Sequence, residues 1–306
     1  MPTLRGPHLS TPLTLRGSDR DALLRDDPGI LAPGEDARYL VTRAGAVALA
    51  EDEDGTLRAV LETDDPRGGT TQPLVLLGRR DGLRVLAVEI AEPSPELDDP
   101  GRDLRDLRRV ADLLAEDDAD LAAAAVAMGA WHRSMRHCPL CGGLLEPEMA
   151  GWVLRCREDG IEQFPRTDPA VIMAVTDEQD RLLLARNIGW PEGRFSVLAG
   201  FVEPGETIAG AVTREVWEEV GVDVRDVTFV ADQPWPFPAS LMLGCTARAT
   251  TTDLTCQPGE IAEARWFTRQ EFLDELREGY VRAAGRLSIS ARLIEGWLGQ
   301  RLDDLG

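Results

Sequence analysis

Three glutamates in the second half of the chain have the spacing of a metal-binding face. Glu215, Glu218 and Glu219 stand at positions i, i+3 and i+4, so on a helix their carboxylates share one side. Like charges at this spacing repel, at a cost of roughly a few tenths of a kcal/mol per pair. A solvated face with arginine partners is the ordinary interpretation, but only Arg214 is close in sequence. A bound Mg²⁺ or Mn²⁺ would neutralise these acids and bridge them to phosphates, so the pattern favours metal-dependent phosphate chemistry.

The residues around the acids carry the signals of a turn followed by a helix. Pro204-Gly205 is typical of a turn, Thr207 can cap a helix start, and Gly221 suits a left-handed C-terminal cap. Between the caps, aliphatic residues at every fourth position predict a buried stripe: Ile208, Val212, Val216 and Val220. The sequence therefore predicts a helix over about 207–220 that carries the three glutamates.

This stretch resembles the Nudix box, in which a glycine, a glutamate, an Arg-Glu pair, a Glu-Glu pair, a second glycine and an aliphatic residue stand at set distances. The matching residues are Gly200, Glu206, Arg214, Glu215, Glu218, Glu219, Gly221 and Val222. The Nudix family hydrolyses nucleoside diphosphates linked to another group. Cleavage of a diphosphate needs positioning and charge neutralisation, both of which metal ions supply, so the resemblance agrees with the chemistry inferred from the acids.

The resemblance also implies roles for individual residues. The implied ligands of Mg²⁺ or Mn²⁺ are Ala199, through its carbonyl, Glu215, Glu219 and, late in the chain, Glu260. Glu218 resembles a further ligand or a contact to the water on the metal. Arg214 resembles the residue that pairs with Glu206 and braces the loop. The expected catalytic residues are Arg214, Glu218 and Glu219, and the choice of general base among the glutamates stays open.

A run of alternating prolines and aromatics follows the box and is the candidate for choosing the substrate. The run comprises Gln233, Pro234, Trp235, Pro236, Phe237, Pro238, Ala239 and Ser240. It could be an edge loop packed by its aromatics, or a stiff platform on which a base stacks, worth roughly 1–3 kcal/mol per base. The run resembles the signature of the NADH pyrophosphatase branch, with Asp232 where that branch usually has serine. By the same resemblance, Phe164, Glu260 and Ser290 are expected to contact the substrate.

Three cysteines form most of a zinc-ribbon pattern. The candidate zinc ligands are Cys138, Cys141, Cys156 and Asp159, with His132 and His137 as alternatives. Asp159 stands where related enzymes have a fourth cysteine, and thiolates are the usual ligands of structural Zn²⁺. The alternative is a ribbon-shaped segment without metal, held by apolar packing of residues such as Trp152 and Leu154.

The net charge of the chain argues against some classes of binding partner. The 306 residues carry a net charge of −21, and all 33 basic residues are arginine. Such a chain should not coat a nucleic-acid backbone or an anionic membrane, so DNA and membrane partners are not expected. No apolar run reaches the length of a membrane span, and no secretory peptide is apparent, which favours a cytoplasmic location. Five cysteines do not suggest a disulfide framework.

The pattern of apolar runs predicts an α+β / α/β chain with three parts. Residues 1–130 are an N-terminal α+β domain with an antiparallel β unit, from short runs over Tyr39–Thr42 to Val85–Ile90, and helices over Leu104–Ala115 and Asp120–Met128. Residues 131–168 are the zinc-ribbon-like segment. Residues 169–300 are the Nudix domain, an α/β/α sandwich with a mixed sheet by resemblance, with further helices expected over 270–277 and 288–298.

The expected activity is hydrolysis of the diphosphate of NAD(H) to NMN(H) and AMP. The same bond occurs in an NAD cap on RNA, so removal of such caps is a further expectation. One alternative is a Nudix hydrolase of ADP-ribose or another nucleoside diphosphate derivative. Another is a non-catalytic nucleotide sensor on a Nudix scaffold, against which the retained glutamates argue. The resemblance implies a homodimer.

Overall fold

The computed structural model describes residues 19–67, 73–90, 103–282 and 287–302, together with residues 11, 13 and 285. The chain divides into two compact units, each of which is described by itself. One comprises residues 13–167 and 234–239, and the other residues 1–12, 168–233 and 240–306. No helix among the described residues has both the length and the apolar character needed to cross a membrane.

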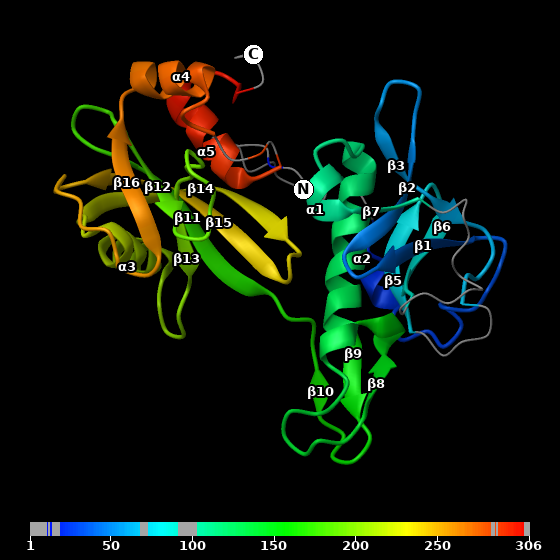
Figure 1. The fold of residues 1–306 in the computed structure, drawn as a ribbon. Coiled ribbons are helices and arrows are strands. Elements are labelled where there is room, and N and C mark those ends of the chain that lie inside the picture. The colour runs from blue at the N-terminus through cyan, green and yellow to red at the C-terminus, as the bar shows by residue number, and fades with distance from the viewer. Residues whose placement is uncertain are drawn as a thin grey trace. The chain divides into compact units, whose positions relative to one another are not determined.

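The first unit contains a mixed sheet in the order β3-β2-β1-β6-β5, with β4 paired to β1 and β7 to β2 (Figure 1). Its strands are β1 (Ala37–Arg43), β2 (Ala46–Glu51), β3 (Leu57–Ala59), β4 (Leu61–Glu62), β5 (Leu74–Arg80), β6 (Leu83–Glu89) and β7 (Leu104–Asp106). The sheet is preceded by a short 3₁₀ turn, η1 (Ala22–Leu24). Helix α2 (Glu116–Ser134) packs on β1, β5 and β6, and its many alanines permit a close approach.

Two expectations for this unit are wrong. The sheet is not wholly antiparallel, because β1 and β6 run parallel, with Tyr39 opposite Leu86. The segments between them are long enough for the crossover that parallel strands require. The expected helix over Leu104–Ala115 is mostly absent, because its first three residues pair with β2 as β7 and only α1 (Leu107–Val110) is helical. Strand pairing here overrides a helical pattern.

A small three-stranded sheet follows α2, and with the segment just before it contains Cys138, Cys141 and Cys156. Its strands are β8 (Leu145–Glu148), β9 (Val153–Cys156) and β10 (Glu162–Gln163), with a 3₁₀ turn, η2 (Met149–Gly151), between the first two. Trp152 attaches this sheet to the larger one, since its Nε1 donates a hydrogen bond to the carbonyl of Leu76 at 2.7 Å. The zinc-ribbon-like shape expected from the sequence is therefore present.

The second unit is an α/β/α sandwich around a mixed sheet in the order β14-β15-β11-β12-β16, with β13 paired to β11. Its strands are β11 (Asp168–Thr176), β12 (Leu182–Asn187), β13 (Leu198–Phe201), β14 (Val224–Trp235), β15 (Ser240–Ala249) and β16 (Ile261–Phe267). Successive residues of β11 face opposite sides. Val171 and Met173 pack with α3 (Ile208–Val220), whereas Ile172 packs with α4 (Arg269–Glu278) and α5 (Ile289–Leu298). The predicted Nudix architecture is confirmed.

Candidate active site

Helix α3 begins and ends as its sequence predicts. The Thr207 hydroxyl accepts a hydrogen bond from the Gly210 amide at 3.1 Å, and Gly221 closes the helix in the left-handed region at φ 73°. Val212, Val216 and Val220 are fully buried against the sheet. Ile208, expected in the same stripe, is 37% exposed, because it lies in the first turn, before the helix reaches the core.

The three glutamates of α3 differ sharply in burial. The Glu219 residue is 5% exposed, whereas the side chain of Glu218 is 43% exposed and that of Glu215 is 14% exposed. Burial, and then the charges of Glu215, Glu260 and Glu218, raise the pKa of Glu219 to about 8. Its Oε2 atom is buried and has no hydrogen-bond partner among the residues that the structure describes. A buried carboxylate without a partner is costly, and a divalent cation would satisfy it, so the donor set fits a hard metal ion.

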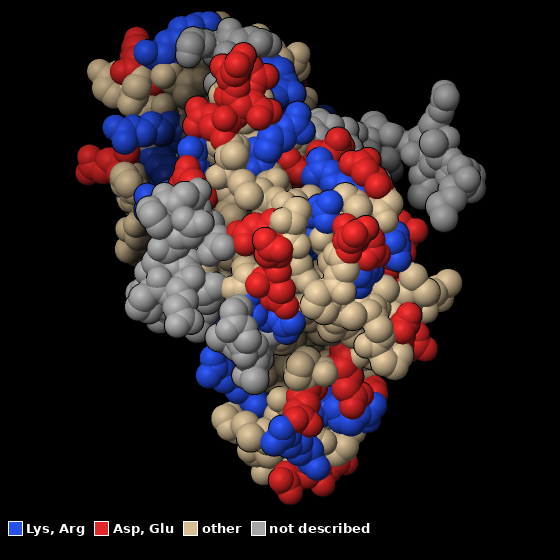
Figure 2. All heavy atoms as spheres, turned by 90° about the vertical axis from the view of Figure 1, so that its right-hand side faces the viewer, with Lys and Arg blue, Asp and Glu red and all other residues tan. Residues whose placement is uncertain are grey.

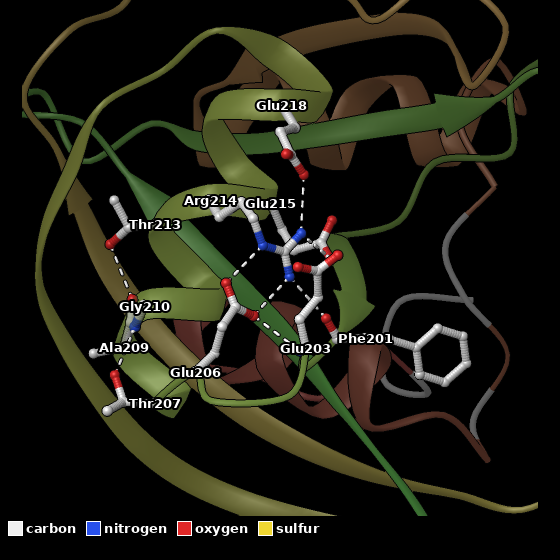
Figure 3. A network of polar contacts seen from close by, with 10 residues as sticks. All are labelled: Phe201, Glu203, Glu206, Thr207, Ala209, Gly210, Thr213, Arg214, Glu215 and Glu218. Atoms are coloured by element: carbon white, nitrogen blue, oxygen red, sulfur yellow. Dashed lines mark hydrogen bonds and ion pairs between the residues drawn. The ribbon is translucent and has the colours of Figure 1, made fainter.

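Arg214 organises the surrounding acids (Figure 3). Its Nε and Nη2 donate to the two carboxylate oxygens of Glu206 at 2.7 and 2.9 Å, and Nη1 donates to both Glu215 and Glu218 at 2.9 Å. Nη2 also donates to the Phe201 carbonyl at 2.9 Å. The bidentate pair holds the pKa of Glu206 at about 2. One arginine thus ties the loop before α3 to two of the acids and leaves the third, Glu219, without a cationic partner.

Strand β13 brings its backbone against the acids. Ala199 and Gly200 pair with Ile172 and Val171 of β11. A Cβ atom at Gly200 would lie 1.9 Å from the carboxyl carbon of Glu215, so no other residue fits there without displacing that carboxylate. The peptide that follows Ala199 therefore adjoins Glu215, as a carbonyl ligand beside the carboxylates would require.

The loop before β16 adds a fourth acid. The Gln257 amide donates to the Glu219 carbonyl, and the Thr255 amide to the Val220 carbonyl, both at 2.8 Å, which ties this loop to the end of α3. Glu260 follows in the same loop and is exposed. Its charge raises the pKa of both Glu215 and Glu219. Acids separated by more than forty residues in the sequence thus lie within electrostatic reach of one another.

Two residues expected to contact the substrate have their side chains in the interior. The Gln233 amide is fully buried, where it donates to the Leu287 carbonyl at 2.7 Å and accepts from the Ile289 amide at 2.8 Å. Ser290 is 1% exposed, and its hydroxyl is hydrogen-bonded to that of Ser196 at 2.7 Å. Both side chains hold the start of α5 against the sheet, a role that nothing in their sequence context indicates.

The proline-aromatic run comprises the last three residues of β14, the turn that follows and the first residue of β15. Trp235 and Phe237 pack edge to face, with ring centroids 5.2 Å apart, and the Arg108 guanidinium lies 6.0 Å from the Trp235 ring centroid. The bond between Phe237 and Pro238 is cis. Pro236 is buried, and the other residues from 234 to 240 are partly or fully exposed. Residues 234–239 and the 63% exposed Phe164 belong to the first compact unit, whereas Ser240 begins β15 in the second.

The cysteine segment assembles a metal-ligand group. The ligand atoms of Cys138, Cys141, Cys156 and Asp159 all lie within 4.8 Å of one another. Cys138 Sγ is 3.5 Å from Asp159 Oδ2, and the Sγ atoms of Cys141 and Cys156 are 3.3 Å apart. A hydrogen bond from the Ile161 amide, with those from the thiols, holds the pKa of Asp159 at about 2. His132 is engaged elsewhere, hydrogen-bonded to the Gly151 carbonyl at 2.8 Å.

The sequence of this chain is similar to family models and to known proteins of the Nudix family. A family model described as NUDIX domain matches residues 166–285, and one described as NADH pyrophosphatase-like rudimentary NUDIX domain matches residues 36–131. A Mycobacterium bovis protein (strain BCG / Pasteur 1173P2) named NAD-capped RNA hydrolase NudC is 40% identical over 310 residues, 94% of this chain and 95% of its own. The human NAD-capped RNA hydrolase NUDT12 is 43% identical over 197 residues, 60% of this chain and 43% of its own.

A solved NUDIX hydrolase from Nitrosomonas europaea is 21% identical, with a TM-score of 0.43 over 55% of this chain and 95% of that one. The assignment to a family is supported by the Mycobacterium bovis relative, which matches almost the whole chain, and by the two family models. The chain belongs to the Nudix hydrolase family, in its NADH pyrophosphatase branch.

Proposed function

We propose that this chain hydrolyses the diphosphate bond of NAD(H) to give NMN(H) and AMP, with a divalent metal ion. The observation that carries the proposal is the buried, unpartnered carboxylate of Glu219 within the acids of the Nudix helix. The NADH pyrophosphatase-like match over residues 36–131 and the names of the relatives support this substrate over other nucleoside diphosphates. The relatives' names also support NAD-capped RNA as a substrate, since the bond to be cut is the same.

The proposed roles follow from how the residues are held. Glu215, Glu219, Glu260 and the Ala199 carbonyl would bind Mg²⁺ or Mn²⁺, which supplies charge neutralisation of the diphosphate and lowers the pKa of water. Arg214 orients Glu215 and Glu218 through its Nη1 hydrogen bonds. Glu218 is the most exposed of the three helix acids and has room to accept a proton from the attacking water. Trp235 and Phe237 offer ring faces for a base.

The test is direct. Purified protein is incubated with NADH and Mg²⁺ or Mn²⁺, with EDTA in a parallel sample, and the products are separated. We expect NMNH and AMP, no product in EDTA, and no turnover by Glu219→Gln. Glu278→Gln is the matched control, because Glu278 is an exposed glutamate at the end of α4. If the protein cleaved ADP-ribose but not NADH, the proposed substrate would be wrong and the alternative, a Nudix hydrolase of ADP-ribose, would be favoured. Binding of NADH without any cleavage would favour a nucleotide sensor.

We also propose that Zn²⁺ is held by Cys138, Cys141, Cys156 and Asp159, which the cluster of their ligand atoms supports. Metal analysis should give one zinc per chain. Three further predictions from the sequence stay predictions. Analytical ultracentrifugation would test the homodimer, and cell fractionation would test the cytoplasmic location. Limited proteolysis would test the domain boundaries at 1–130, 131–168 and 169–300.

A further inference from the structure

Two arginines of the second unit, Arg194 and Arg282, lie opposite one another in a β-bridge and form no ion pair with any residue that the structure describes. Arg194 lies in the loop between β12 and β13 and forms an isolated parallel bridge with Arg282. The Arg282 amide donates to the Gly193 carbonyl at 2.7 Å, and the Phe195 amide to the Arg282 carbonyl at 3.1 Å. Residues opposite one another in such a bridge project to the same side, where like charges destabilise the pairing. Both arginines are exposed, and within the described part of the chain neither side chain forms an ion pair.

The chain has 54 acidic residues, and arginines elsewhere are typically paired with one of them, as in Arg225 with Asp226 at 2.8 Å. Figure 2 shows one face on which acidic and basic side chains are interspersed, with no continuous basic area. Two adjacent unpaired arginines in a chain of net charge −21 therefore point to an anion that binds between or beside them.

The surroundings hold the pair in place and add aromatic surface. The Arg194 guanidinium lies 4.8 Å from the ring centroid of Trp190, which restrains it by a cation–π contact. A Cβ atom at Gly193 would lie 2.4 Å from the Tyr280 carbonyl oxygen, so the two segments approach as closely as a glycine allows. Tyr280 itself, two residues before Arg282, is 69% exposed. Cationic groups beside an exposed aromatic are what single-stranded nucleic acid requires, because phosphates need charge and bases need a flat face.

The loop that carries Arg194 is attached to the acidic site at both ends. At its start, the Ile188 amide donates to the Glu260 carbonyl at 2.8 Å. At its end, Ala199 follows Arg194 by five residues, a span of at most roughly 17 Å even when extended. The arginine pair therefore belongs to a loop that adjoins the acidic site, although within the described residues neither arginine bonds to Glu215, Glu218 or Arg214.

We propose that Arg194 and Arg282, with Tyr280, bind the nucleotide that follows the NAD cap in a capped RNA. The arginines bind its phosphate and Tyr280 stacks on its base. This inference rests on the proposed function, because it assumes that the acidic site takes the cap. A narrow cationic entry of this kind reconciles an RNA substrate with a chain whose net charge of −21 repels RNA elsewhere.

The experiment compares the double variant Arg194→Gln/Arg282→Gln with Arg225→Gln/Arg277→Gln. The control removes two exposed arginines that are paired with acids, so the change in net charge is the same. The first readout is fluorescence anisotropy of a short, uncapped, labelled RNA over a series of salt concentrations. The second is the ratio of kcat/KM for NAD-capped RNA to kcat/KM for NADH. Tyr280→Ala provides an independent variant with no change of charge.

We expect the double variant to bind RNA about tenfold more weakly and to lower the slope of log affinity against log salt by about 0.7, the value for the loss of one phosphate contact to a single strand. The kcat/KM ratio should fall about tenfold, and Tyr280→Ala should lower it without changing the salt slope. The inference would be overturned if the double variant bound RNA as tightly as the control variant and had the same kcat/KM ratio. It would also be overturned if the double variant lost kcat/KM equally on capped RNA and on NADH. A third outcome is that the wild-type protein does not cleave NADH but binds RNA, and that the double variant loses this RNA binding. In that case the proposed activity would be wrong, whereas the RNA-binding surface would be supported.

Discussion

Replacing Glu219 by glutamine should make the metal-free protein more stable at alkaline pH while it removes turnover. The Glu219 residue is 5% exposed, and its Oε2 atom is buried without a hydrogen-bond partner. Burial, followed by the charges of Glu215 and Glu260, raises its pKa from 4.5 to about 8. Without a metal ion, ionisation of this carboxyl in the folded protein is therefore unfavourable.

The sign and size of the effect follow from linkage. The folded protein binds this proton more tightly than the unfolded chain does. The stabilisation is thus fully present below about pH 4.5 and is lost as the pH rises through about 8. From 4.5 to about 8 is 3.5 pH units, which at about 1.36 kcal/mol per unit makes about 5 kcal/mol, nearly all of it lost by pH 8. A glutamine does not titrate, although its buried amide costs about 1–3 kcal/mol at every pH.

The assay is urea unfolding of the wild type and Glu219→Gln in EDTA at pH 5, 6.5 and 8, followed by tryptophan fluorescence. The free energy of unfolding of the variant, relative to the wild type, should rise by about 3 kcal/mol between the lowest and highest pH. Added Mg²⁺ should stabilise the wild type and leave the variant unchanged. A difference that does not vary with pH would refute the reasoning, because Glu219 would then ionise as freely in the folded protein as in the unfolded chain.

Three further predictions follow from the same geometry. Gly200→Ala should displace the Glu215 carboxylate, which would lie 1.9 Å from the new methyl group, and lower kcat at least about a hundredfold; a near-normal kcat at an unchanged melting temperature would contradict it. Trp235→Ala should lower kcat/KM for NADH about tenfold more than for a small diphosphate ester, and equal losses would mean that the aromatic run is only structural. Asp159→Ala should lower the bound zinc measured by mass spectrometry, whereas Asp159→Cys should retain it; zinc unaffected by Asp159→Ala would exclude this residue as a ligand.

Local signals in the sequence were sufficient for the acidic helix. Its caps, its valine stripe and the spacing of its glutamates all depend on residues within one or two turns of one another, which is the range over which helix geometry acts. The same holds for Cys138 and Cys141, whose spacing places both thiols on one turn. The helix predicted over Leu104–Ala115 failed because its first residues pair with β2, a strand more than fifty residues earlier.

Two of the substrate contacts that the resemblance implies show what a motif leaves open. Gln233 and Ser290 were expected to contact substrate, yet both side chains are buried in hydrogen bonds that stabilise the start of α5. Burial of a single polar side chain depends on what packs over it, so a motif cannot reveal it. Arg194 and Arg282 carried no sequence signal at all, because the bridge that pairs them joins segments almost ninety residues apart.

The sequence by itself determined the family, the class of chemistry and the helix that carries it, because these depend on residue types at short, regular spacings. Only the tertiary structure decided how those residues differ. It buried Glu219 and raised its pKa, left Glu218 open to solvent, and brought the charge of Glu260 from a distant loop to Glu215 and Glu219. The physical reason is that desolvation and charge proximity depend on distances through space, which the chain sets only when β13, α3 and the loop before β16 pack together.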